Sequence, residues 1–197
     1  RGCLLSRGLG DVYKRQLMNK EIICAGFGGQ GVLTAGLILA EAGFRKGQNL
    51  TWYPSYGSEM RGGTANCNVK LSDEEIGSPY CNELDILLAM NAPSVERFEH
   101  MIKPGGILLY NRDMVEADKI TRQDITALSV PANELSAGAE NSKGANLVML
   151  GVLEKATGMF GKEELAAAIA AYFDKKGKGK YLSANIAAFD AGYRLYS

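Results

Sequence analysis

Apolar residues fall into short runs of strand length and longer runs with helical spacing, and the two kinds alternate along most of the chain. The predicted strands are 21–25, 49–53, 65–71, 84–90, 107–110 and 127–130. The predicted helices are 32–42, 94–102, 145–156, 163–173 and 182–196. Strands that alternate with helices predict a three-layer α/β/α, Rossmann-like domain with a mostly parallel sheet.

The first predicted helix, 32–42, is apolar on nearly every face, which is typical of a helix sandwiched inside a protein. Gly43 follows it and is predicted to end it, because glycine commonly adopts the left-handed conformation just after a helix.

Residues 1–17 differ from the rest of the chain, since they show neither helical nor strand periodicity and do not begin with Met. Met18 precedes the first predicted strand and resembles a natural start. We therefore interpret 1–17 as a non-native or disordered leader and 18–197 as a single domain.

Composition excludes several classes of protein. The 197 residues carry 22 basic and 22 acidic side chains, a balance that argues against binding to nucleic acid or an anionic membrane. No apolar run reaches the roughly 20 residues that span a bilayer. The four cysteines are scattered and His100 is the single histidine, so a zinc site or an iron–sulfur cluster held by this chain alone is not expected. Unpaired cysteines are typical of a reducing cytoplasm, where we expect the protein.

A glycine loop follows the first predicted strand and opens the first predicted helix. It reads Gly26-x-Gly28-x-x-Gly31, and Gly28, Gly29, Gln30 and Gly31 form its dense part. Glycines let a backbone approach a phosphate or carboxylate closely, and a helix N-terminus adds free N–H groups. The alternative is a tight turn without a ligand. A nicotinamide dinucleotide site also needs an acidic residue at the end of the second strand, and 44–56 contain neither Asp nor Glu.

A second polar loop is predicted between the second and third strands, at the ligand-binding edge of the sheet. It contains Ser58, Glu59, Arg61, Gly62 and Gly63. Glu59 could orient Arg61, whose forked guanidinium suits a carboxylate or phosphate. The alternative is an exposed turn with a surface ion pair worth under ~1 kcal/mol.

These two loops resemble those of a known family. The stretches GFGGQGVLTAGLILAEAG and WYPSYGSEMRGGTANCNVKLSDEEIGSP are similar to the gamma subunit of 2-oxoacid:ferredoxin oxidoreductases. The likeness continues through LDILLAMN, KPGGILLYN and 141–146 and covers 20–196. Short chains of this kind look most like the subunits of 2-oxoglutarate or branched-chain 2-oxoacid enzymes.

The resemblance implies a part of a larger oxidoreductase that is not active alone. The complete enzyme would decarboxylate a 2-oxoacid, here 2-oxoglutarate, to acyl-CoA and CO₂ and reduce ferredoxin. Thiamine diphosphate, Mg²⁺ and the iron–sulfur clusters would belong to alpha, beta and ferredoxin-like subunits. This chain would hold no catalytic residue and would shape the active-site and coenzyme A cleft. The two loops, from Gly28 to Gly31 and from Ser58 to Gly63, would then be its candidate coenzyme A or anion contacts.

Two other interpretations stay open. One is a self-contained Rossmann-like enzyme that binds a nucleotide or S-adenosylmethionine, against which the missing ribose-binding acid argues. The other is a purely structural assembly subunit whose loops contact only partner chains.

Overall fold

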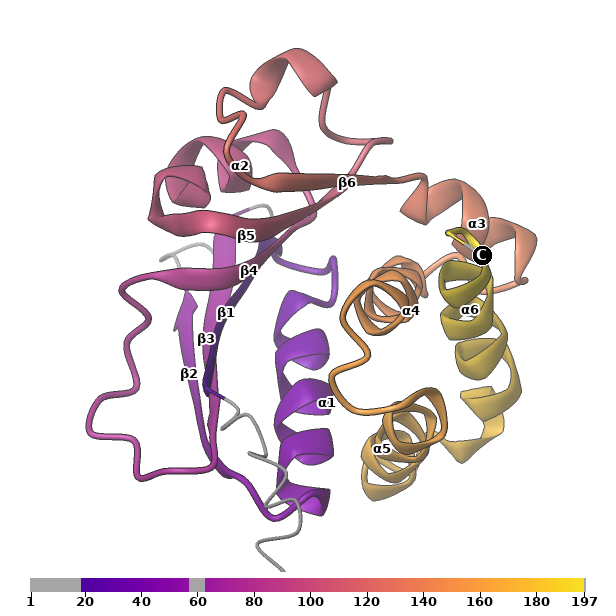
Figure 1. The fold of residues 1–197 in the computed structure, drawn as a ribbon. Coiled ribbons are helices and arrows are strands. Elements are labelled where there is room, and N and C mark those ends of the chain that lie inside the picture. Colours follow the sequence, from indigo (N-terminus) through magenta and orange to yellow (C-terminus); the bar gives the residue numbers. More distant parts are fainter. Residues whose placement is uncertain (1–18, 57–62, 197) are drawn as a thin grey trace, which may run out of the picture.

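The computed structural model describes residues 19–56 and 63–196, which form a six-stranded sheet flanked by helices (Figure 1). The strands are β1 (Asn19–Phe27), β2 (Asn49–Tyr56), β3 (Thr64–Ser72), β4 (Leu84–Ala89), β5 (Ile102–Asn111) and β6 (Thr126–Val130). The α-helices are α1 (Val32–Arg45), α2 (Ala92–Phe98), α3 (Ala132–Gly138), α4 (Ala145–Thr157), α5 (Lys162–Lys175) and α6 (Leu182–Arg194). The predicted leader 1–17 lies outside the described residues and stays a prediction.

The sheet has the strand order β2-β3-β1-β4-β5-β6 and is mixed. The pairs β1–β4, β4–β5 and β5–β6 are parallel, whereas β3 runs antiparallel to both β1 and β2. The predicted α/β class is therefore confirmed, and β3 is the one strand that departs from a parallel sheet. It departs because β2 and β3 are paired as antiparallel neighbours rather than joined through a crossover helix.

Helices cover the two faces of the sheet unequally. On one face α1 and α4 pack against the strands, and α5 and α6 lie outside them (Figure 1). This side holds the larger core, which includes Ile22, Leu88 and Phe189. On the other face the short α2 covers a smaller core around Leu87 and Leu108. The three predicted layers are present, and on the thin side no helix of the described residues 19–56 and 63–196 covers β2 and β3.

Glycines let α1 lie close against the sheet. A Cβ at Gly36 would overlap the sulfur of Cys67, and a Cβ at Gly43 would lie 2.5 Å from Leu71 Cδ2. The prediction that Gly43 ends the helix is wrong, since α1 continues to Arg45 and Lys46 caps it. This position inside the helix is a glycine because Leu71 of β3 leaves no room for a side chain there.

The three cysteines of the described residues are buried in the strands and in the loop before β4. Cys24 of β1 is directly opposite Cys67 of β3, and the hydrogen bond between the two thiols, with burial, raises the pKa of Cys24. Burial also raises the pKa of Cys81 to about 12. The thiols of Cys24 and Cys81 are therefore protonated at neutral pH, and all three cysteines are part of the packing. No helix among 19–56 and 63–196 is long and apolar enough to cross a membrane.

Candidate functional site

The glycine loop lies where the winding direction of the sheet reverses. It follows the carboxyl end of β1, next to the carboxyl end of β4. The helix after β1 covers one face of the sheet, and the helix after β4 covers the other. Open α/β sheets bind ligands at such a point, because the two chain segments diverge and leave a crevice.

The side chain of Gln30 holds the loop in shape. Its Oε1 accepts hydrogen bonds from Phe27 N at 2.7 Å and from Asn91 Nδ2 at 3.1 Å. Its Nε2 donates to the carbonyl of Met90 at 3.3 Å. Gln30 was a candidate ligand contact, but its side-chain amide forms hydrogen bonds within the chain instead. These bonds link the end of β1 to the end of β4.

Replacing Gln30 with Met is expected to lower the free energy of unfolding by about 1–2 kcal/mol, because a near-isosteric side chain leaves the Phe27 amide and the Met90 carbonyl unpaired. Urea unfolding followed by circular dichroism measures the change. Gln123→Met, at an exposed position, is the matched control and should shift the value by less than about 0.5 kcal/mol. Equal effects of the two variants would contradict the assigned role of Gln30.

Two glycines of the loop adopt backbone conformations that favour glycine. Gly29 has φ +100° and Gly31 has φ +74°. Gly31 is the N-cap of α1, and its carbonyl accepts a hydrogen bond from Asn146 Nδ2 at 3.1 Å. Gly28 N donates to the carbonyl of Gly63 at 3.0 Å, so the structure brings one residue of the second predicted loop beside the first.

Ser58, Glu59, Arg61 and Gly62 lie outside the described residues, and the roles assigned to them stay predictions. His100 lies in a short 3₁₀ segment, Glu99–Met101, after α2 and is exposed.

A pocket of about 630 Å³ opens beside the glycine loop. Gly29, Gly31 and Thr34 form one side, the loop 140–143 and the start of α4 form another, and the α5–α6 connection closes the third. A smaller hollow of about 310 Å³ adjoins the same loop, lined by Phe27, Gly28 and the first turn of α1. The glycine loop therefore separates two concave surfaces.

The pocket is electrostatically suited to an anion. Both α1 and α4 begin at it, neither helix has a side-chain cap, and neither has an acidic residue in its first turn. Free N–H groups and the positive end of a helix dipole favour negative charge at such points. Lys143 and Lys178 line the pocket against a single carboxylate, that of Glu140.

A buried amide in the pocket lacks a partner. Asn185 of α6 is 5% exposed, and its Oδ1 accepts a hydrogen bond from Asn141 Nδ2 at 2.8 Å. Its Nδ2 is buried, and no described residue accepts a hydrogen bond from it. Buried polar groups are nearly always paired, so an unpaired donor in a polar pocket indicates that a ligand acceptor or a water completes it.

Sequence reasoning found the loop but missed the opposite wall of this pocket. Asn141 and Asn146 were noted as part of the resemblance, without a role. Lys178 belongs to the basic segment 175–180, whose charge and glycines predict an exposed turn, and no pattern singles out Tyr181 or Asn185. The available signal was the density of Asn and Gly at 141–146, directly before an apolar helix.

Comparison with protein families gives a match over nearly all of the described residues. The family described as pyruvate ferredoxin/flavodoxin oxidoreductase matches residues 21–195. The ketoisovalerate oxidoreductase subunit VorA of Methanothermobacter marburgensis is 42% identical over 85% of this chain. This chain spans 34% of the length of that relative. The 2-oxoglutarate synthase subunit KorC of Methanocaldococcus jannaschii is 36% identical over 92% of this chain and 96% of its own length.

Solved structures share the fold. The 2-oxoglutarate:ferredoxin oxidoreductase from Magnetococcus marinus, solved with 2-oxoglutarate, coenzyme A and succinyl-CoA bound, matches with a TM-score of 0.79 and 27% identity over 90% of this chain and 31% of its own. The gamma subunit of a keto/oxoacid ferredoxin oxidoreductase from Geobacter sulfurreducens matches with a TM-score of 0.74 and 28% identity over 88% of this chain and 96% of its own.

Proposed function

Because the chain belongs to the pyruvate ferredoxin/flavodoxin oxidoreductase family, we propose that it is the gamma subunit of a 2-oxoacid:ferredoxin oxidoreductase. The reaction is the oxidative decarboxylation of a 2-oxoacid to an acyl-CoA and CO₂ with reduction of ferredoxin. The match to KorC, a 2-oxoglutarate synthase subunit, over most of both chains supports this assignment.

The substrate we propose for the complex is 2-oxoglutarate. KorC relatives from three further archaea also match, two of them over 90% of this chain. The VorA relatives are more identical, but this chain spans only 34% of their length, so a branched-chain 2-oxoacid is the second candidate.

Within that complex, we assign the binding of coenzyme A to the pocket beside the glycine loop. The observation that carries this assignment is the buried, unpartnered amide of Asn185 at a pocket where two uncapped helices begin. Coenzyme A carries a pyrophosphate and a further phosphate, which accept hydrogen bonds from such donors. Lys143 and Lys178 supply the charge, and the half-exposed ring of Tyr181 offers a flat surface on which a nucleotide base can stack.

This chain binds and orients the nucleotide end of coenzyme A and performs no bond-breaking step itself. Gln30 and Asn146 act on the glycine loop: the first ties it to β4 and the second ties it to α4. The hydrogen bond of Asn146 fixes two walls of the pocket relative to each other, and those of Gln30 anchor the glycine loop on the sheet. Thiamine diphosphate with Mg²⁺, and the iron–sulfur clusters, supply the carbanion and electron-transfer chemistry from partner subunits.

Affinity capture of the native protein, followed by an assay of the captured assembly, tests the proposed function. We expect alpha and beta subunits to be captured with it. The assembly should reduce a low-potential viologen dye when given coenzyme A and 2-oxoglutarate, and reduce it more slowly with pyruvate or 2-oxoisovalerate. Faster reduction with 2-oxoisovalerate would reassign the substrate, and an assembly inactive on every 2-oxoacid would contradict the proposal.

Two further measurements separate the competing interpretations. A self-contained enzyme would bind NADH, NADPH or S-adenosylmethionine as the isolated chain, and we expect a titration to detect no such binding. A purely structural subunit would leave the apparent affinity for coenzyme A unchanged when its pocket is altered.

A further inference from the structure

Another pocket lies at the opposite edge of the sheet. It has a volume of about 430 Å³ and lies at the starts of β1, β4 and β5, next to the end of α4. The glycine loop follows the other end of β1, and a nine-residue strand places the two edges about 25 Å apart. This pocket is therefore separate from the proposed coenzyme A site.

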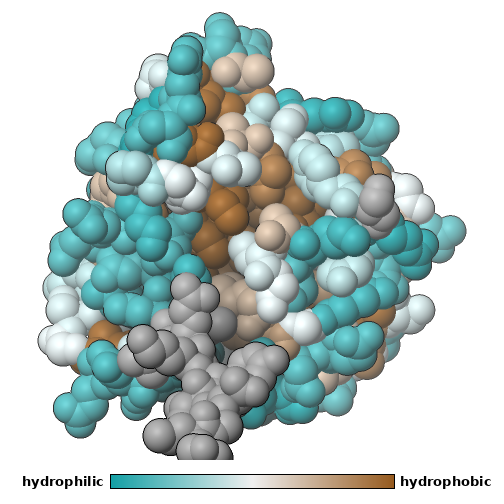
Figure 2. Space-filling model, viewed as in Figure 1, coloured by the Kyte–Doolittle hydropathy of each residue, from teal (hydrophilic) through white to brown (hydrophobic). Residues whose placement is uncertain are grey.

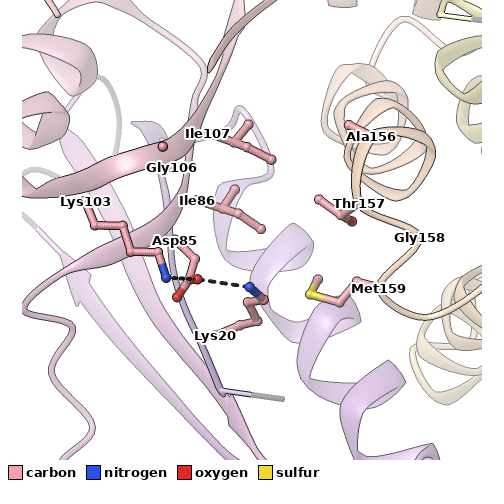
Figure 3. A pocket seen from close by; sticks show the side chains of 11 residues that line it. Lys20, Asp85, Ile86, Lys103, Gly106, Ile107, Ala156, Thr157, Gly158 and Met159 are labelled. Atoms are coloured by element: carbon pink, nitrogen blue, oxygen red, sulfur yellow. Dashed lines mark hydrogen bonds and ion pairs between the residues drawn. The ribbon is translucent and has the colours of Figure 1, made fainter. Parts of the chain in front are cut away.

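Apolar side chains form part of two facing walls of this pocket. Ile86 and Ile107 project from β4 and β5 on one side, and Ala156, Thr157 and Met159 face them from the end of α4 (Figure 3). Hydrophobic surface is visible at the centre of this side of the molecule, between the strands and the helices (Figure 2). Ile86 and Met159 are already buried, so an apolar body that enters between these walls would remove mainly the surface of Ile107 and Ala156 from water.

Three charged side chains lie together at the edge of the pocket. The ammonium groups of Lys20 and Lys103 both contact Oδ1 of Asp85, Lys20 at 3.0 Å (Figure 3). Asp85 Oδ2 accepts a hydrogen bond from Glu21 N at 3.0 Å, so both carboxylate oxygens are engaged. Burial alone would raise the pKa of Asp85, but hydrogen bonds from Lys103, the Glu21 amide and Lys20 lower it below its ordinary value. The cluster thus has two positive charges and one negative charge.

The two lysines keep donors for a ligand. An ammonium group has three N–H donors, and Asp85 takes one from each lysine. The side chains of Lys20 and Lys103 remain 39% and 43% exposed, whereas that of Asp85 is 8% exposed. The end of α4 across the pocket has the negative end of its helix dipole, which disfavours an anion there. A negative group is therefore stabilised at the lysines and an apolar group opposite them.

We infer that this pocket binds a short aliphatic carboxylate, with its carboxylate on Lys20 and Lys103 and its chain between Ile86, Ile107 and Met159. The inference rests on these residues alone and does not depend on the proposed function.

Titration of the ¹⁵N-labelled full chain with butyrate, followed by NMR, tests the inference. We expect saturable shifts of the amide signals of Ile86, Gly105, Gly106 and Ile107. Butyramide has the same shape without the charge and should bind about two- to fivefold more weakly, the difference typical of a partly exposed charge pair. The absence of a saturable shift with butyrate, or equal binding of butyramide, would overturn the inference.

Two variants should change butyrate affinity in opposite directions. Lys103→Met removes a ligand donor and should weaken binding about fivefold, whereas Asp85→Asn removes the competing carboxylate and should strengthen it by a similar factor. Lys20→Met should weaken butyrate binding as Lys103→Met does. If Asp85→Asn does not fold, the two lysine variants together test the inference. Lys119→Met, at an exposed position that lines neither pocket, is the control and should leave the affinity unchanged. Unchanged affinity in both lysine variants would refute the assignment, as would a loss in Asp85→Asn when that variant is folded.

Discussion

Replacing Gly192 with Ala is expected to lower the free energy of unfolding by about 3 kcal/mol or more, because α4 and α6 cross in backbone contact there. A Cβ at Gly192 would overlap the Val148 carbonyl, and a Cβ at Gly151 would overlap the Phe189 carbonyl. Both obstacles are main-chain atoms of the other helix, which cannot rotate away as a side chain can. The helices would have to separate and lose the packing of Phe189 in the core.

Urea unfolding followed by circular dichroism measures this effect, with Gly138→Ala as the control. Gly138 ends α3, and nothing lies within 4 Å of the position that its Cβ would take. That variant should leave the free energy of unfolding unchanged or raise it by up to about 1 kcal/mol, as Gly→Ala does at an unobstructed helical position. If Gly192→Ala were as stable as Gly138→Ala, the close crossing of α4 and α6 would be wrong. The crossing bears on the site because α4 carries Asn146 and α6 carries Asn185.

The double variant Lys143→Met/Lys178→Met is expected to raise the KM for coenzyme A of the assembled oxidoreductase about tenfold, because two cations near its phosphates are lost. Its kcat should change little, since neither lysine touches the reacting atoms. Steady-state dye reduction with varied coenzyme A gives both constants.

Lys180→Met is the matched control for that variant. Lys180 belongs to the same basic segment but does not line the pocket. Lys180→Met should leave the KM for coenzyme A within about twofold of the wild-type value, because removing an exposed charge that contacts no ligand has a small effect on binding. An equal rise of KM in the control would indicate a general effect of charge on the complex rather than contacts in this pocket.

Local sequence patterns predict one wall of the site. The other wall depends on tertiary contacts, which those patterns do not contain. The run of apolar residues, glycines and a second apolar segment at 21–42 defines a strand, a loop and a helix without reference to the rest of the chain. The opposite wall depends on Asn146, which is 115 residues from its partner Gly31, and on Asn185 beyond it. No local pattern encodes which helix start meets the glycine loop.

Individual glycines and amides show the same limit. Gly43 has the position of a helix cap in the sequence, yet it is a contact residue because β3 lies against it. Gln30 has the position of a ligand group, yet its amide is engaged by Phe27, Asn91 and Met90. α3 was missed because its buried positions are the small residues Ala132 and Ser136, which give no apolar stripe.

The position of coenzyme A on the assembled complex tests the central claim most directly. Electron cryomicroscopy of the complex with coenzyme A should place a phosphate in the pocket that Asn185 lines, beside the first N–H groups of α1 or α4 and the ammonium groups of Lys143 and Lys178. Phosphates held only by other subunits, with the Asn185 pocket filled by a partner chain, would contradict the claim that this chain binds the nucleotide.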